Sequence, residues 1–194
     1  SSAAMASFLT LLGAVLCSLM VSSQVVPQAD FDLQIAGKWY HIGLATNAER
    51  YVSRRGKINM GTYVITPLPN GDLDLLYSSV YNGTCRKMDK VANKTDVPGK
   101  YRSISRRTGH LSVLSIVDVK YDEYALTHAV NTKENDTYIV NKLYGRDADL
   151  SAEVQEKFRQ FSLQTGVLPE NVMFFPKSDG CPSLSLVLPE VSSC

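Results

Sequence analysis

No stretch of this 194-residue sequence is apolar for long enough to span a bilayer as a helix, which takes roughly 20 residues. The longest apolar run, residues 8–21 (FLTLLGAVLCSLMV), has the length of the hydrophobic segment of a secretory signal peptide, and the small residues Val21-Ser22-Ser23 follow as at a cleavage site. No basic residue precedes the run, and Met5 is a candidate initiator. We therefore expect residues 1–23 to be a signal peptide and the rest to be secreted.

The sequence has no excess of either charge, since 20 Lys and Arg residues stand against 19 Asp and Glu residues. Surfaces that bind nucleic acids need a basic excess or a basic stripe, and neither is present. Internal repeats, charge runs and low-complexity tracts are also lacking. The expected mature chain, residues 24–194, is long enough for one domain with a sizeable core. We expect this single domain to have no nucleic-acid partner and no membrane span.

Cysteine is scarce, and no cysteine or histidine has the spacing of a metal site. Cys17 lies in the expected signal peptide, so Cys85, Cys181 and Cys194 remain, and oxidising conditions should join two of them. Cys85 with Cys181 is the better pair, because Cys194 ends a tail of small residues from about 182 onward. Cys194 is then free to link a partner chain, and the protein is otherwise expected to be a monomer without metal or cofactor.

Short β-rich runs fill the sequence from about residue 37 to 145. They are KWYHIGLA, INMGTYVIT, DLDLLYSSV, LSVLSIVDV, YALTHAV and TYIVNKLY. Turn signals separate them, the clearest at residues 67–72. An amphipathic helix is then predicted at about 150–165, with a short strand at 172–175. One helix after about eight short strands favours a closed up-and-down antiparallel barrel over a sandwich, with the helix packed outside.

Three sequons for N-glycosylation support export from the cell. They begin at Asn82, Asn93 and Asn135, each near the end of a predicted strand. We expect a glycoprotein.

Three motifs in order resemble the lipocalin family over nearly all of the expected mature chain. They are Gly37-Lys38-Trp39, the segment 119–125 (VKYDEYA), and Arg146 in the sequence LYGR. The resemblance implies an eight-stranded barrel with a ligand cavity, in which Trp39 plugs the closed end and Arg146 lies over its ring. Within the family, the chain is most similar to the group of lipocalin-type prostaglandin D synthase, α1-microglobulin and neutrophil gelatinase-associated lipocalin.

This resemblance raises an enzymatic alternative, since the synthase isomerises its substrate with a cavity cysteine thiol. The matching position here is Gly61, and the supporting hydroxyl positions fall at His41, Tyr63 and Tyr77. The region of the thiol of α1-microglobulin is Thr46-Asn47-Ala48, also without cysteine. We therefore expect a carrier rather than an enzyme, with prostaglandin isomerase as the disfavoured alternative and a secreted immune or signalling glycoprotein as another.

Strand alternation predicts which side chains line the cavity. The expected ligand-binding residues are His41, Tyr63, Ile65, Leu75, Tyr77, Leu114, Ile116, Val140, Lys142 and Tyr144. For the strand around 124–130, the sequence leaves open whether Thr127 or the face with Leu126 and His128 points inward. Lys142 either faces the cavity, where it favours an anionic ligand group, or reaches solvent at the rim. Fatty acids, retinoids, tetrapyrroles and xenobiotics all match an apolar body with an acidic head, whereas inward tyrosines narrow the cavity.

Overall fold

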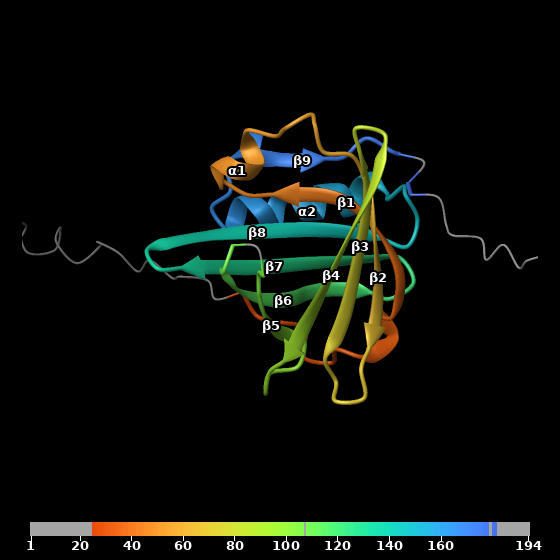
Figure 1. The fold of residues 1–194 in the computed structure, drawn as a ribbon, viewed down its shortest axis with the longest axis vertical. Coiled ribbons are helices and arrows are strands. Elements are labelled where there is room, and N and C mark those ends of the chain that lie inside the picture. Colours follow the sequence, from red (N-terminus) through yellow and green to blue (C-terminus); the bar gives the residue numbers. More distant parts are fainter. Residues whose placement is uncertain (1–24, 107, 179, 182–194) are drawn as a thin grey trace, which may run out of the picture.

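Eight antiparallel strands form a closed barrel in a computed structural model that describes residues 25–106, 108–178 and 180–181. The strands are β1 (Gly37–Ala45), β2 (Gly61–Pro67), β3 (Leu73–Tyr81), β4 (Thr84–Lys94), β5 (Lys100–Ile104), β6 (Leu111–Lys120), β7 (Tyr124–Lys133) and β8 (Asp136–Gly145). Each strand pairs with the next, and β1 pairs with both β2 and β8, which closes the sheet (Figure 1). A ninth strand, β9 (Val172–Phe174), adds to β1.

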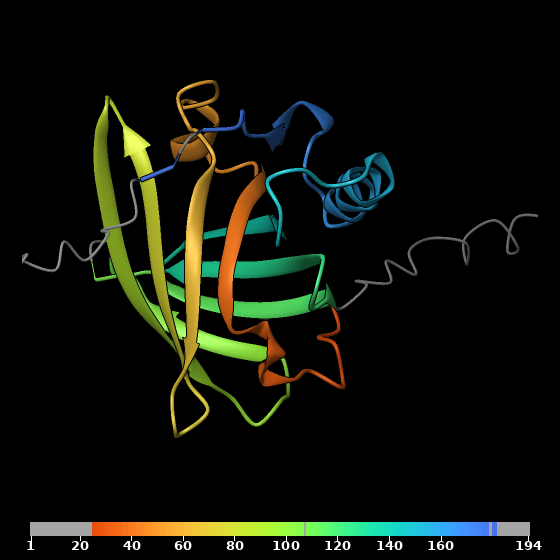
Figure 2. The ribbon, with the colours of Figure 1, turned by 90° about the vertical axis from the view of Figure 1, so that its right-hand side faces the viewer.

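The helices lie outside the barrel or at its ends (Figure 2). The main helix is α2 (Ala152–Gln164), and the shorter ones are α1 (Glu49–Val52), η1 (Leu33–Ile35) and η2 (Pro169–Asn171). One end of the barrel carries α1 and the β3–β4 turn, and we call it the mouth. The opposite end carries η1 and the β2–β3 turn. The barrel with one outer helix confirms the fold expected from the sequence. No helix in the described part of the chain is long and apolar enough to cross a membrane.

Helix α2 covers the outer face of β7, β8 and β1. The Ser151 hydroxyl accepts a hydrogen bond from the Val154 amide (3.3 Å) and so caps the helix. Phe158 is fully buried and packs so close to β1 that a Cβ built at Gly43 would lie 2.9 Å from its ring. Leu143 is fully buried with Phe158 in one core cluster.

The register decides the orientation of β7 that the sequence left open. Thr127 pairs with Lys142 and points inward, whereas Leu126 pairs with the outward Leu143 and is buried beneath α2. His128 also points outward, where its Nδ1 lies 2.7 Å from Oδ1 of Asn141. Both faces of β7 are buried, one by the helix and one by the barrel, so hydrophobicity alone did not separate them.

Trp39 and Arg146 close the end of the barrel opposite the mouth, as the family resemblance implied. The Trp39 ring is fully buried, and its Nε1 donates a hydrogen bond to the Ile35 carbonyl (2.7 Å). The Arg146 guanidinium lies 3.8 Å from the ring centroid. It also donates hydrogen bonds to four backbone carbonyls, those of Gln34, Ala36, Lys38 and Tyr121. One side chain therefore joins η1, β1 and the β6–β7 turn.

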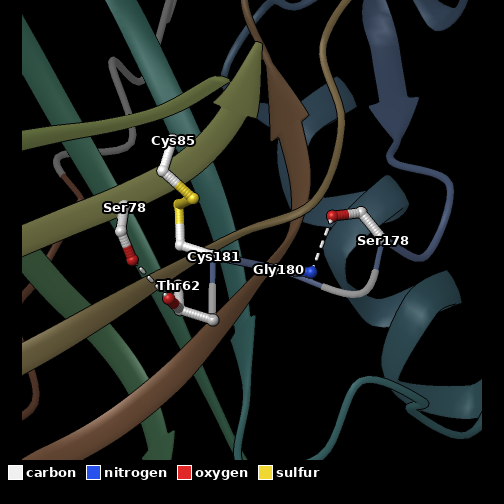
Figure 3. The surroundings of a disulfide bond; sticks show 6 residues. All are labelled: Thr62, Ser78, Cys85, Ser178, Gly180 and Cys181. Atoms are coloured by element: carbon white, nitrogen blue, oxygen red, sulfur yellow. Dashed lines mark hydrogen bonds between the residues drawn. A yellow bond between two sulfur atoms is a disulfide. The ribbon is translucent and has the colours of Figure 1, made fainter. Parts of the chain in front are cut away.

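The expected disulfide between Cys85 and Cys181 is present (Figure 3). It joins the start of β4 to the segment after β9, with the two Cα atoms 5.4 Å apart and 96 residues apart in sequence. On the adjacent strands, the hydroxyls of Thr62 and Ser78 are hydrogen-bonded at 2.8 Å. The predicted signal peptide, Cys17, the tail and Cys194 lie outside the described residues.

Replacing Arg146 with Ala should lower the free energy of unfolding by about 2–4 kcal/mol, because the change removes the cation–π contact and leaves four carbonyls without their donor. Arg146→Lys keeps the charge without the planar fork, so it should recover only part of that loss. Urea unfolding of the wild type and both variants measures the effect. A loss below about 0.5 kcal/mol for Arg146→Ala, the range of ordinary surface changes, would contradict this role.

Candidate functional site

The candidate site is the barrel interior, whose inward face is defined by the strand register. Across β1, β2 and β3, Trp39 pairs with Tyr63 and Tyr63 pairs with Tyr77. Across β6, β7 and β8, Ile116 pairs with Thr127 and Thr127 pairs with Lys142. These rows place all of the expected cavity residues on the inward face: His41, Tyr63, Ile65, Leu75, Tyr77, Leu114, Ile116, Val140, Lys142 and Tyr144. That they bind a ligand stays a prediction.

Side chains do not fill this interior. On β8, the outward residues Asn141 and Leu143 are fully buried beneath α2. Lys142 and Tyr144 point the other way, yet both keep partial access to solvent. Because the helix covers the outer face, that access must come from inside the barrel. The interior therefore holds space beside these two side chains.

His41 lies among aromatic rings on the inward face of β1. Its ring stacks on Tyr144 at 5.5 Å between centroids and makes edge contacts with Phe175 at 5.0 Å and Tyr63 at 5.9 Å. The side chain is buried, and neither ring nitrogen has a hydrogen-bond partner among the described residues. Burial, reinforced by the nearby cation of Lys142, lowers the pKa of His41 well below its usual value. His41 is therefore neutral at physiological pH.

Lys142 faces the cavity, which decides between the two positions considered from the sequence. Its Nζ donates a hydrogen bond to the Tyr63 hydroxyl (2.9 Å) and lies 5.1 Å from the Tyr63 ring centroid. Burial alone would lower the pKa of Lys142, but the phenol oxygens of Tyr144 and Tyr63 favour the charged form and the pKa stays above its usual value. Burial also raises the pKa of Tyr144, so this phenol stays neutral. The centre of the site is an ammonium group held by phenols.

Lys90 is a second inward lysine, which the sequence did not reveal. It pairs with Leu75 and so shares the inward face of β4 with Met88 and Ala92. Burial lowers the pKa of Lys90 to about 8, and the cation of Lys142 contributes to this shift. Its strand is polar over most of its length and was not predicted as a strand. The alternation of Met88, Lys90 and Ala92 was the available signal.

No acidic side chain faces these lysines from the barrel strands. Between residues 37 and 145, the described Asp and Glu residues lie in turns, in α1 or on the outward face, apart from Asp136, which is exposed at the mouth end of β8 beside His110. Asp118, for example, accepts a hydrogen bond from Lys157 of α2 (2.8 Å). Asp72 sits in the β2–β3 turn, where it accepts a hydrogen bond from the Lys94 amide. The interior of the barrel is therefore a positively charged space lined by apolar and aromatic groups.

Gly61, the position of the synthase thiol, leaves no room for a cysteine side chain. The residue is buried, and a Cβ built on it would lie 2.5 Å from the ring and the hydroxyl of Tyr77. Tyr77 thus occupies the space that a thiol at this position would need. In the region matching the second thiol, the Thr46 hydroxyl donates a hydrogen bond to the Ile139 carbonyl (2.5 Å). Both positions serve packing here.

A hollow of about 710 Å³ lies at the mouth, between α1, the first part of β8 and the residues that follow α2, and was not anticipated from the sequence. It is lined by Asn47, Ala48, Glu49, Arg50, Asp136, Thr137, Tyr138, Ile139, Thr165 and Gly166. Inside it, the Arg50 guanidinium lies 4.0 Å from the Tyr138 ring centroid. His110 Nε2 lies 3.0 Å from the Asp136 carboxylate nearby. Neither Lys90 nor Lys142 lines this polar hollow.

The three predicted glycosylation sites differ in their surroundings. Asn82 is exposed in the β3–β4 turn with a positive φ of 50°, and Asn135 is exposed in the β7–β8 turn. Asn93 instead lies within β4, and its side-chain nitrogen donates a hydrogen bond to the Asp72 carboxylate (2.9 Å). A glycan is joined to that same nitrogen. The two turn sites therefore offer the better acceptors.

Comparison with known proteins identifies the scaffold. A family model for the lipocalin / cytosolic fatty-acid binding protein family matches residues 36–179. The chain belongs to this family. A protein named lipocalin from Rhinella marina is 38% identical over 169 residues, which cover 87% of this chain and 92% of that protein. Prostaglandin-H2 D-isomerase of Mus musculus is 32% identical over 146 residues, covering 75% and 77% of the two chains.

Other relatives extend the likeness within the family. Major urinary protein 20 of Mus musculus is 32% identical over 148 residues, covering 76% of this chain and 80% of that protein. The solved structure of the siderocalin Ex-FABP superposes with a TM-score of 0.66 at 26% identity, covering 75% of this chain and 95% of the other. Lipocalins carry small hydrophobic ligands, so the barrel interior is the site to interpret.

Replacing His41 with Leu should make stability less dependent on pH. The unfolded chain takes up a proton at His41 below a pKa of about 6.5, whereas the folded chain keeps this ring neutral, so stability is present above that pH and is lost as the pH falls. At pH 5 the wild type should have lost up to about 2 kcal/mol more than His41→Leu, relative to pH 7.5. Urea unfolding at both pH values measures this difference. Parallel losses in the two proteins would contradict it.

Proposed function

We propose that this lipocalin is an extracellular carrier or scavenger of a small hydrophobic molecule with an acidic head group, held in the barrel interior. The observation that carries the proposal is the pair of inward lysines, Lys90 and Lys142, neither of which is hydrogen-bonded or salt-bridged to a carboxylate in the described part of the chain. A carboxylate from a ligand supplies the missing negative charge.

The electrostatic argument follows from burial. An ammonium group in an enclosed, apolar space is destabilised unless it is paired or well hydrogen-bonded. Tyr63 accepts one hydrogen bond from Lys142, and Lys90 has no partner among the described residues. A bound carboxylate accepts charge-assisted hydrogen bonds from one or both lysines. Binding then raises the pKa of Lys90 back toward its usual value, so a proton is taken up with the ligand.

The rest of the interior accommodates an apolar ligand body. Leu75, Ile65 and Leu114 face the same space as the lysines and keep partial solvent access. Fatty acids, retinoids, tetrapyrroles and acidic xenobiotics combine such a body with an acidic group. The tyrosines and His41 limit the width of the space, which favours slender ligands over broad ones.

Secretion is part of the proposal. The apolar run at residues 8–21 supports a signal peptide. The disulfide between Cys85 and Cys181 supports maturation in an oxidising compartment. Exposed sequons at Asn82 and Asn135 add to this support, so we propose a secreted glycoprotein glycosylated mainly in its turns.

The alternatives have weaker support. Placement in the group of prostaglandin D synthase, α1-microglobulin and neutrophil gelatinase-associated lipocalin stays a proposal, although a prostaglandin isomerase is among the relatives. Isomerase chemistry lacks its thiol at Gly61, where Tyr77 fills the space. A secreted immune or signalling role finds support only in the likeness to a siderocalin structure.

Lys142→Met should weaken binding of a fatty acid such as oleic acid about 10- to 100-fold, because a charge-assisted hydrogen bond contributes about 1.5–3 kcal/mol. Binding of oleyl alcohol, which has the same apolar body without the charge, should change much less. Isothermal titration calorimetry of the wild type, Lys142→Met and the charge-preserving Lys142→Arg measures both ligands. Equal effects on acid and alcohol, or unchanged acid binding in Lys142→Met, would refute the anionic head-group proposal.

Turnover of a prostaglandin endoperoxide tests the enzymatic alternative. The wild type should show no isomerisation above the spontaneous rate, with or without added thiol, because the cavity position is Gly61. The Cys194→Ala variant controls for the remaining cysteine of the expected mature chain. Clear turnover that survives in Cys194→Ala would show that the barrel catalyses the reaction without a thiol and would overturn the carrier interpretation.

A further inference from the structure

The two inward lysines differ in what surrounds their amines. Lys142 donates a hydrogen bond to Tyr63, and its cation lies over the Tyr63 ring. The amine of Lys90 makes no hydrogen bond and no salt bridge within the part of the chain that the structure describes. One lysine is thus fixed as a cation by its neighbours, and the other is free to react.

Lys90 also lies where a molecule entering from the mouth can reach it. Met88, two residues nearer the mouth on the same inward face of β4, is 60% exposed. Ala92, two residues farther from the mouth, is only 2% exposed. The amine of Lys90 is therefore part-way down the interior, between the mouth and the packed end beneath Trp39.

We propose that Lys90 captures lipophilic aldehydes inside the barrel by forming an imine through its Nζ. This activity goes beyond the reversible carriage proposed above and shares with it Lys90 and the requirement that the interior admits an apolar chain.

The charged and titratable groups that face Lys90 set its reactivity. On the inward face of the barrel strands, the register places His41 on β1, Tyr63 on β2, Tyr77 and Tyr81 on β3, Arg86 on β4, Tyr101 on β5, Lys133 on β7, and Asp136, Tyr138, Lys142 and Tyr144 on β8. Tyr81, Lys133 and Asp136 are exposed at the mouth ends of their strands. Burial lowers the pKa of His41 and raises that of Tyr77, Tyr101 and Tyr144, so these groups are neutral at pH 7.4. The positive charge inside the barrel near Lys90 is that of Lys142; Arg86 lies at the mouth, as does Lys133, which pairs with Asp136.

These surroundings favour the neutral amine, which is the nucleophile. A pKa of about 8 leaves roughly one Lys90 side chain in five unprotonated at pH 7.4. An exposed lysine with a pKa of about 10.4 has roughly one in a thousand. Desolvation and a neighbouring cation activate catalytic lysines in the same way. Lys142 supplies the neighbouring cation here.

The reaction is balanced with the aldehyde as its one co-reactant. The Nζ lone pair attacks the carbonyl carbon, proton transfer gives a carbinolamine, and loss of water forms the C=N bond. No oxidant or reductant is needed. The unprotonated imine carries no charge, so its formation also removes the repulsion between Lys90 and Lys142. A carboxylate ligand acts in the opposite direction, because it stabilises the protonated amine and thereby protects Lys90.

The test uses the full mature chain with nonanal as the probe. Sodium cyanoborohydride traps any imine as a stable secondary amine, and mass spectrometry after proteolysis locates it. With one equivalent of nonanal at pH 7.4, Lys90 should be labelled at least about tenfold faster than exposed lysines such as Lys133, given its larger neutral fraction. The rate at Lys90 should rise with pH to a half-maximum near 8.

Matched variants separate reactivity from folding. Lys90→Arg keeps the charge and should lose the fast labelling. Lys142→Met should keep labelling at Lys90 but shift its pH midpoint upward, because the neighbouring cation is gone, whereas Lys142→Arg should leave the midpoint near 8. Urea unfolding confirms that each variant is folded. Even labelling across the exposed lysines, or fast labelling that persists elsewhere in Lys90→Arg, would overturn the proposal.

Oleic acid distinguishes this inference from the proposed function. Saturating oleic acid should slow the labelling of Lys90. If oleic acid binds in a Lys142-dependent manner but Lys90 reacts no faster than exposed lysines, only the aldehyde proposal fails. If Lys90 is labelled rapidly but oleic acid does not bind, the carrier proposal fails and the aldehyde chemistry stands.

Discussion

Closure of the sheet is the constraint on which the rest of this molecule depends. Because β1 pairs with both β2 and β8, the inward side chains between the two ends of the barrel face other strands rather than bulk water. The register then fixes which residues meet, and a shift by one position would exchange the two faces of a strand. Arg146 donates hydrogen bonds to four carbonyls and lies over the Trp39 ring. These contacts stabilise the end of the barrel opposite the mouth, where β1 starts.

Much of this architecture can be predicted from the sequence, for identifiable reasons. Trp39 and Arg146 belong to motifs with fixed spacing, and the cysteine count leaves Cys85 and Cys181 as the better pair. Strands with one apolar face show their alternation, as β2 and β3 do. The orientation of β7 was not predictable, because α2 buries the face that a barrel without an outer helix would expose to solvent.

The inward position of Lys90 was not predicted, for the opposite reason. Its strand, β4, is exposed over most of its outer face and near the mouth. The sequence of β4 is therefore mostly polar, a pattern that is typical of a loop. Only pairing with β3 shows that Lys90 shares a face with Leu75 and Ala92. No sequence pattern distinguishes an inward lysine on a polar strand from an outward one. Its position follows from the register, and its lowered pKa follows from burial and a second lysine on β8, far away in sequence.

The side chains of the interior leave no room for a catalytic thiol and favour the chemistry of lysine amines. Tyr77 fills the space beside Gly61 and so removes the room for a thiol, while Tyr63 and Tyr144 hold Lys142 as a cation without neutralising it. Burial raises the pKa of Tyr144, so this phenol accepts no negative charge to offset Lys142 and the charge inside stays positive. A ligand carboxylate and a neutral imine are two different ways to relieve that charge, one by pairing it and one by removing it. Because both involve Lys90 and both are reversible, the concentrations and affinities of the two ligands determine which of them the barrel performs.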